Sequence, residues 1–144
     1  MDIQLINNEL LALLHKQAKT SKRRRQNFDL RTTPDDGSQR MLNVLEPKTR
    51  VPIHRHRNTS ETAICIEGSI DWIFYQELPN MDSGVIASDG DTVLDSSSFK
   101  EVARFRISPR ENNFGIQIPP MTWHSIEVHE PSAIVESKDG PYGK

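Results

Sequence analysis

The stretch His54-Arg55-His56, followed by Glu61 and much later by His124, is the most informative part of the chain. Alternate side chains of an extended strand share one face, so His54 and His56 point to the same side. A short turn after His56 brings the Glu61 carboxylate to the same place. His124 is predicted to come from a distant strand, since a closed pocket draws ligands from both walls. These four residues predict a site for one divalent metal ion, which is zinc, iron, manganese or nickel.

Two histidines one residue apart also occur on exposed polar strands, so the pair alone leaves both interpretations open. Glu61, Gly68 and the segment 118–124 stand at spacings compatible with a shared site, and together they favour the metal interpretation. His15 lies in a predicted helix and His129 in a predicted turn, so neither is assigned to the site.

The composition predicts a small protein with a single core. The chain has 144 residues, and its 18 Lys plus Arg against 20 Asp plus Glu give a formal charge of -2. This balance disfavours nucleic acid and membrane surfaces as partners. Its one cysteine, Cys65, excludes an intramolecular disulfide and a thiolate metal cluster. The first residues lack a secretory signal pattern, and no stretch is apolar enough to span a bilayer, so a cytoplasmic location is predicted.

The first thirty residues are predicted to differ from the rest. An amphipathic helix, laid on a sheet or on a partner subunit, is indicated by apolar residues at helical spacing: Ile3, Ile6, Leu10, Leu13 and Leu14. The run Lys22-Arg23-Arg24-Arg25 follows and complements the negative end of that helix. It has no interleaved aromatic side chains, which disfavours nucleic-acid binding. Residues 1–30 therefore form a helix and basic segment, and residues 31–144 a β-barrel domain.

Short β-type segments separated by turn residues predict an all-β sandwich or barrel. The predicted strands are 39–45, 51–56, 61–66, 70–75, 85–87, 102–107, 114–118, 124–128 and 133–136. The segment 79–100 is rich in Ser, Asp and Gly and is predicted to form a hairpin or lid. Cys65 shares the parity of Glu61 and is predicted to be a small buried group. Trp72 and Phe74 face the core, where one of them lines the pocket.

The motifs resemble those of a known superfamily. The run His54-x-His56-x4-Glu61-x6-Gly68 resembles the first cupin motif, and residues 118–124 resemble the second. The segment 39–56 narrows the resemblance to the WbuC-type cupin metalloproteins, as does the Gly-Pro-Tyr near the end of the chain. This resemblance implies a double-stranded β-helix, or jelly-roll barrel, with an N-terminal helix. It also implies a homodimer and an association with surface-polysaccharide biosynthesis.

Three motif positions depart from the cupin pattern. Lys48 stands where the first motif usually has glycine, and Met121 stands where the second has it. Val128 replaces a usual asparagine. Glycine eases turns with unusual dihedral angles, so differently shaped loops are predicted at these positions. None of the three substitutions removes a metal ligand.

The predicted site constrains the chemistry. A divalent ion with one carboxylate and three neutral imidazoles carries a net charge near +1 and attracts an anionic or oxygen-rich ligand. Such an ion polarises a carbonyl group and acidifies the adjacent C–H bond. The leading hypothesis is a metal-dependent isomerase or epimerase acting on a sugar or nucleotide-sugar intermediate. Two alternatives stay open: an iron-dependent dioxygenase, and a non-catalytic module that binds or senses a small molecule.

Four residues are predicted to contact the substrate. Arg25 or Arg40 reaches the mouth of the barrel and holds an anionic group through its guanidinium. Gln39, next to Arg40, and Trp72, as the pocket aromatic, complete the predicted set.

Overall fold

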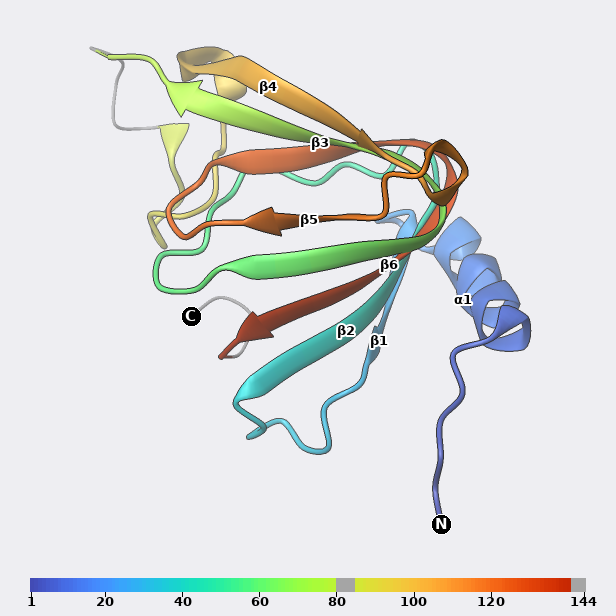
Figure 1. Cartoon of the computed structure of the whole chain (residues 1–144). Helices are drawn as coiled ribbons and strands as arrows, with labels where there is room; N and C mark the ends of the chain where they lie inside the picture. Colours follow the sequence, from blue (N-terminus) through green and yellow to red (C-terminus); the bar gives the residue numbers. More distant parts are fainter. Residues whose placement is uncertain (80–84, 141–144) are drawn as a thin grey trace.

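A computed structural model describes residues 1–79 and 85–140. Within that part, the strands follow the order β1-β2-β6-β3-β4, with β5 also paired to β3, and every pair is antiparallel. The elements are α1 (Asn8–Thr20), β1 (Arg25–Asp29), β2 (Ser38–Leu45), β3 (Glu61–Glu77), β4 (Phe99–Ile107), β5 (Gly115–Ile118), β6 (His124–Asp139) and the short 3-10 helices Ser96–Ser98 and Pro109–Glu111. Figure 1 shows α1 outside the strands, which confirms the predicted all-β fold with an N-terminal helix. No helix of the described ranges has the length and apolarity needed to cross a membrane.

The two long strands β3 and β6 form the centre of the fold. They contain 17 and 16 residues and pair along almost their whole lengths. The first part of β3 also pairs with β5 and the later part with β4, so a single strand contributes to both walls of the barrel. The sequence predicted each long strand as two short ones. That prediction is wrong, because the chain bends at these places without leaving the sheet.

The bend in β3 depends on Gly68, whose φ is 96°. The pairing with β6 is irregular between Cys65 and Ile70. A Cβ atom on Gly68 would lie only 2.6 Å from the Cα atom of Ser132. The Ser132 hydroxyl in turn accepts a hydrogen bond from the main-chain N–H of Ser69, at 3.0 Å. Gly68 therefore lets the two strands approach closely where both change direction.

The barrel interior is filled by side chains from alternate positions of the strands. Its buried apolar cluster consists of Leu45, Ala63, Cys65, Ile70, Trp72, Ile107, Ile118, Val128 and Ile134. Burial raises the pKa of the Cys65 thiol to about 11. This confirms the prediction that Cys65 is a small buried group, because an unreactive protonated thiol behaves as an apolar side chain.

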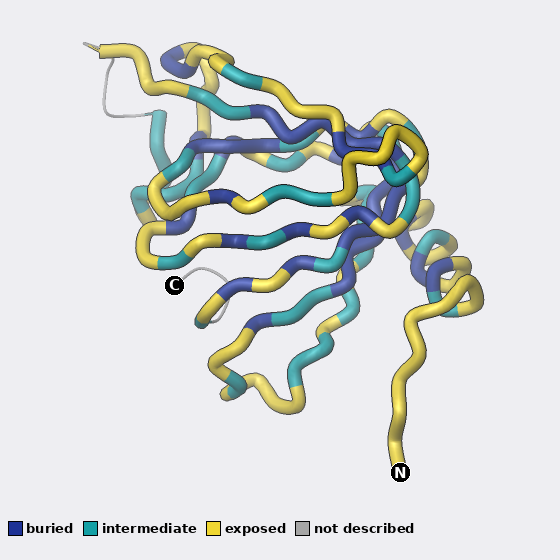
Figure 2. The backbone as a smooth tube through the Cα atoms, in the orientation of Figure 1, coloured by how far each residue is buried: buried dark blue, intermediate teal, exposed yellow. Residues whose placement is uncertain are grey.

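Helix α1 begins later than its apolar pattern predicted. Asn7 caps it, since the Asn7 side chain accepts the N–H of Leu10 at 3.0 Å. Ile3 and Ile6 precede this cap and are exposed, and Leu13 within the helix is 52% exposed. The buried helix residues Leu11, Leu14 and Ala18 form one apolar cluster with strand residues of β2 and β6, namely Leu42, Val44 and Ala133. Figure 2 shows this burial along the inner side of the helix, with the preceding residues exposed.

Two predicted strands are reduced to single bridges, and one strand was missed. The segment 51–56 pairs only at His54, which bridges to Thr92 and His124. The segment 85–87 pairs only at Ile86. Part of the predicted hairpin, residues 80–84, lies outside the described residues. Strand β1 was missed because it starts at Arg25, inside the basic run that the sequence assigned to the helix end.

The loops with non-glycine motif residues keep a left-handed backbone. Lys48 has a φ of 75° and Met121 a φ of 63°. Both residues therefore adopt the backbone conformation that glycine would ease, and the difference in loop shape stays a prediction. The Met121 N–H donates to the carbonyl oxygen of His56 at 2.7 Å, so this loop helps to hold the segment that carries the histidines.

Replacing Met121 by glycine is expected to raise the free energy of unfolding by roughly 0.5–1 kcal/mol, because the left-handed strain on a side-chain-bearing residue is relieved. Thr122→Gly is the control, since Thr122 has no positive φ and glycine there only adds freedom to the unfolded chain. Urea unfolding measures both variants. Equal destabilisation by the two would show that the Met121 backbone carries no strain.

Candidate metal centre

Three imidazoles meet where the segment before β3 crosses the start of β6. His54 and His124 exchange main-chain hydrogen bonds of 3.0 and 2.9 Å, which sets their side chains next to each other. Their ring centroids are 4.3 Å apart, and the His56 ring lies 5.3 and 5.8 Å from them. One nitrogen from each ring lies within 4.8 Å of the others. The structure thus brings together the three histidines that the sequence predicted as ligands.

The orientation of two of these rings is set by main-chain carbonyl groups. His54 Nδ1 lies 2.9 Å from the Pro52 carbonyl oxygen, and His124 Nδ1 lies 2.8 Å from that of Thr122. A carbonyl oxygen only accepts, so each Nδ1 carries the proton and donates it. The Nε2 lone pairs are then available to a metal ion, in the arrangement that orients histidine ligands in metalloproteins.

Burial keeps these two histidines neutral. It is the main cause that lowers the pKa of His54. It also lowers the pKa of His124 to about 4, with a further contribution from His54. Metal binding requires the unprotonated imidazole, so neither ring has to lose a proton near neutral pH.

Glu61, the first residue of β3, adds a carboxylate to the imidazoles. Its Oε2 atom lies 2.8 Å from His56 Nε2. Burial by itself would raise the pKa of Glu61, but its interactions with His56, His124 and His54 outweigh burial and lower the pKa. Two ligand atoms about 2.1 Å from one ion and at right angles to each other would be about 3 Å apart. The Glu61–His56 spacing therefore fits two ligands of the same ion.

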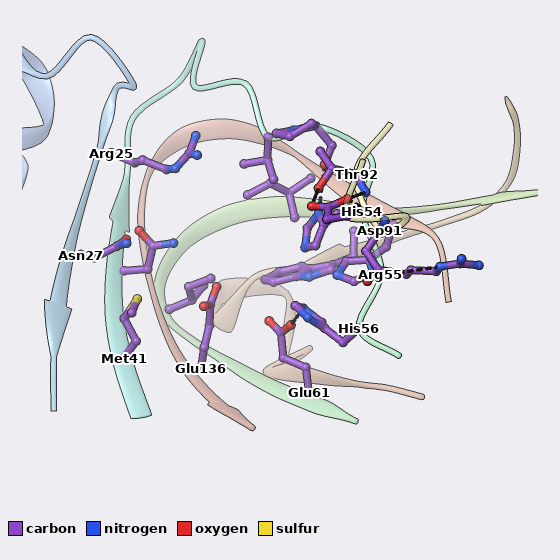
Figure 3. Close-up of a pocket in the computed structure, with 18 of the residues that line it drawn as sticks. Arg25, Asn27, Met41, His54, Arg55, His56, Glu61, Asp91, Thr92 and Glu136 are labelled. Atoms are coloured by element: carbon purple, nitrogen blue, oxygen red, sulfur yellow. Dashed lines mark hydrogen bonds and ion pairs between the residues drawn. The ribbon is translucent and has the colours of Figure 1, made fainter. Parts of the chain in front are cut away.

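The four side chains lie at one end of a cavity of about 690 Å³. This volume is within the range of roughly 300–1,000 Å³ that small-molecule sites occupy. Figure 3 shows His54, His56 and Glu61 on one side, with Arg25 and other side chains from β1 and β2 facing them. The cavity therefore offers room for a small molecule beside the metal centre.

The predicted substrate residues divide into two pairs. Arg25 and Trp72 line the cavity, whereas Gln39 and Arg40 are not among the lining residues. Arg40 alternates with Met41, which does line it, and so faces the outside of β2. Its guanidinium lies 2.9 Å from the carboxylate of Asp36. The structure thus does not support the predicted role of Arg40 in holding the substrate. Gln39 is buried on the same face as Met41 but does not line the cavity.

The polar residues of the cavity wall that the sequence missed include one on β2 and one on β6. Asn43 and Glu136 both line it, although each lies in a strand that was predicted. Alternation along β2 would have placed Asn43 on the same face as Met41 and Leu45, where a polar residue is unusual. The sequence therefore contained this signal, but it did not show which other residues lie near Asn43 in the fold.

The segment before β4 also reaches the site, through Asp91. The Asp91 carboxylate accepts from Arg55 at 3.1 Å and pairs with Arg57 at 2.9 Å. The Arg55 guanidinium additionally lies 4.2 Å from the ring centroid of Trp123. The two arginines beside the histidines therefore tie the segment around residue 91 to the cavity mouth.

A second group of potential ligands lies on the outer face of the barrel. Asp71, Glu127 and His129 meet there, and His129 lies within β6 rather than in the predicted turn. The buried carboxylate of Asp71 is already hydrogen-bonded to Arg104 and Arg106. A cation would have to compete with these guanidinium groups, so the cluster is an ion-pair network.

Replacing Asp71 by asparagine is expected to lower stability by roughly 2 kcal/mol at pH 7 and by little near pH 2. Burial would raise the pKa of Asp71, but hydrogen bonds from Arg106, His129 and Arg104 bring it down to about 2. With a folded pKa below the ordinary value, the contribution is complete above about pH 4 and is lost as the pH falls through 2. Denaturant unfolding at several pH values measures this. A deficit that does not depend on pH would contradict it.

Comparison with known proteins supports the fold. Residues 6–86 match the model of a family described as a domain of unknown function, DUF6016. None of the curated proteins matches the sequence. KdgF from Halomonas sp. is similar in structure with a TM-score of 0.53 at 14% identity, over 81% of this chain and 79% of that chain.

Two further solved structures are similar. The cupin domain of Schizosaccharomyces pombe Cnp3 has a TM-score of 0.54 at 8% identity, over 83% of this chain and 67% of that one. The capsular polysaccharide assembling protein CapF from Staphylococcus aureus has a TM-score of 0.56 at 16% identity, over 85% of this chain. The match covers only 30% of CapF. These likenesses confirm the cupin fold that the motifs implied, while the narrower WbuC-type resemblance stays a prediction.

Proposed function

The chain belongs to the DUF6016 family of domains of unknown function, and from its site we propose that it is a metal-dependent cupin-fold protein acting on an oxygen-rich small molecule. One divalent ion is held by His54, His56, Glu61 and His124. The reaction class is an isomerisation or epimerisation of a sugar or nucleotide-sugar intermediate.

One observation carries this proposal. Three histidines and a glutamate from segments up to 70 positions apart converge at one end of a cavity. Two of the imidazoles have their Nδ1 atoms hydrogen-bonded to carbonyl groups, and the carboxylate has a lowered pKa. Zinc, iron, manganese and nickel ions bind such a set of preorganised neutral nitrogens and one anionic oxygen.

When bound, the ion would polarise a carbonyl group and acidify its neighbouring C–H bond. The residues of the chain orient and enclose the substrate. Trp72 supplies an apolar wall of the cavity, and Arg25 supplies a positive charge on the side that faces the histidines. A sugar substrate is supported by the similarity to a capsular polysaccharide assembling protein. It is also supported by the net positive charge of the centre, which attracts oxygen ligands.

Metal analysis of protein purified without nickel resin tests the metal site, and one ion per chain is expected. Removing the ion with a chelator is expected to lower the thermal midpoint, since the ion binds only the folded state. A chain that holds no ion, even after incubation with each of the four metals, would overturn the proposal.

A screen of sugar phosphates and nucleotide sugars, with and without oxygen, tests the reaction. Formation of an isomer without oxygen consumption is the expected result. Oxygen consumption on turnover would replace the isomerase by a dioxygenase. Metal-dependent binding without any turnover would replace it by a non-catalytic binding module.

The cytoplasmic location, the homodimer and the absence of nucleic-acid partners remain predictions. The homodimer is checked by light scattering at micromolar concentration, where a monomeric mass would contradict it.

A further inference from the structure

Asn43 is a buried polar residue whose side chain has no hydrogen-bond partner among residues 1–79 and 85–140. It is 9% exposed and lines the cavity. Its Oδ1 atom is fully buried, and its amide forms no hydrogen bond with any residue of the described ranges. A buried amide oxygen without a hydrogen bond destabilises the protein. A side chain that is costly to the free protein and faces a cavity is suited to a ligand that supplies the missing hydrogen bonds.

Two other polar side chains share the wall with Asn43. Asn27 on β1 lies directly opposite Asn43 on β2, and Glu136 on β6 lies opposite Met41, one position further along the same face of β2. Figure 3 shows Asn27, Met41 and Glu136 on the wall that faces the histidines. An amide both donates and accepts, and a carboxylate accepts twice. A group that itself donates and accepts, such as a hydroxyl, satisfies this combination.

Positive charge lies along the same wall. The Arg25 guanidinium is held in place by the carbonyl oxygen of Arg50 at 3.0 Å and the hydroxyl of Thr49 at 3.3 Å. Arg23 also lines the cavity and makes no ion pair with any residue that the structure describes. Guanidinium groups beside a centre with net positive charge favour a carboxylate or a phosphate.

We propose that Asn27, Asn43 and Glu136 form a subsite for the hydroxyl groups of a polyhydroxylated anion, with Arg25 facing its negative group. This rests on the proposed function, because the same cavity holds the metal centre. The ligand class is a sugar acid or a sugar phosphate. The hydroxyl groups lie along β1, β2 and β6, and another part of the molecule approaches the histidines.

Isothermal titration of the metal-loaded protein tests the ligand class. The probes are D-galacturonate, D-glucose 1-phosphate and glycolate. Glycolate can chelate a metal but lacks the chain of hydroxyl groups. At least one sugar probe is expected to bind tenfold or more tightly than glycolate, and the stronger of the two identifies a carboxylate or a phosphate as the anionic group. Binding of glycolate as tight as both sugars would overturn the subsite.

Substitution of Asn43 by leucine tests the residue assignment. Binding of the preferred sugar probe is expected to weaken tenfold or more, while metal stoichiometry stays the same. The thermal midpoint is not expected to fall, because an unpartnered amide is replaced by an apolar group of similar size. A lower midpoint with unchanged sugar binding would mean that Asn43 is structural, and would overturn the assignment.

Gln39→Leu is the matched control. Gln39 lies on the same strand, is 2% exposed and has an amide oxygen without a hydrogen-bond partner, but it does not line the cavity. Its replacement is expected to leave sugar binding unchanged. Asn27→Ala provides a second variant at an exposed position, where folding is not at risk, with a threefold or larger loss expected. Unchanged binding in both asparagine variants would overturn the subsite.

The two proposals fail in different ways. A protein that binds metal but neither sugar probe retains the metal site and loses the subsite. A protein without metal loses the proposed function, and the subsite is then judged by the same titrations on the metal-free chain. Loss of sugar binding in Asn43→Leu but not in Gln39→Leu supports the subsite, and an equal loss in the two variants overturns it.

Discussion

Replacing His56 by alanine is expected to reduce bound metal from one ion per chain to a small fraction of that value, with affinity falling by more than about 100-fold. The variant loses one of three converging imidazoles and the partner of the Glu61 carboxylate. The barrel is expected to remain folded, because His56 belongs to none of the buried apolar clusters. Metal analysis after dialysis, together with circular dichroism, measures both effects.

His129→Ala is the control for this variant. His129 belongs to the outer cluster with Asp71, and its loss is expected to leave the metal content unchanged. Glu61→Gln keeps the shape of the fourth ligand but removes its charge, so weaker binding with an altered pH dependence is expected. Full metal content in His56→Ala would show that the ion, if present, lies elsewhere.

Replacing Gly68 by alanine is expected to destabilise the fold by about 3 kcal/mol or more. The new Cβ atom meets the main chain of Ser132 at 2.6 Å, and a φ of 96° is unfavourable for alanine even without that overlap. Either β3 or β6 must move, and the hydrogen bond from Ser69 to Ser132 is then lost. Thermal and denaturant unfolding measure the effect, with a fall in midpoint on the order of 10 °C expected.

Two other glycines separate the causes of that effect. Gly140 has a φ of 76° but open space around it, so Gly140→Ala reports the backbone strain alone. Gly37 has open space and no positive φ, so alanine there is expected to be neutral or slightly stabilising. If Gly68→Ala is no worse than Gly140→Ala, the close approach to Ser132 is unimportant.

The shared direction of the first two histidines was predictable because it depends on a local rule. Alternation in an extended segment aligns His54 with His56, and this holds although the segment pairs only at a single bridge. The position of His124 opposite His54 follows from long-range pairing, which the spacing of residues alone does not contain. It was predicted correctly through the resemblance of residues 118–124 to a known motif.

The errors have two physical origins. Residues that share one apolar spacing do not all belong to the same helix. Ile3 and Ile6 continue the spacing of α1, but they precede the cap at Asn7 and lie outside the helix. Strand pairing also decides which face of a strand points into the barrel. Arg40 was predicted at the cavity mouth because of its charge, yet its neighbours Gln39 and Met41 occupy the inner face of β2.

The span of β3 and β6 has a consequence for how the protein folds. Glu61 begins the first of these strands and His124 begins the second, so the site is assembled only after contacts between very distant parts of the chain have formed. Such non-local contacts slow folding, because the chain loses the entropy of closing long loops before the contacts stabilise it. Under the proposed function, a partly folded chain lacks the complete set of ligands, so ion uptake during refolding is expected to mark the final stage of assembly.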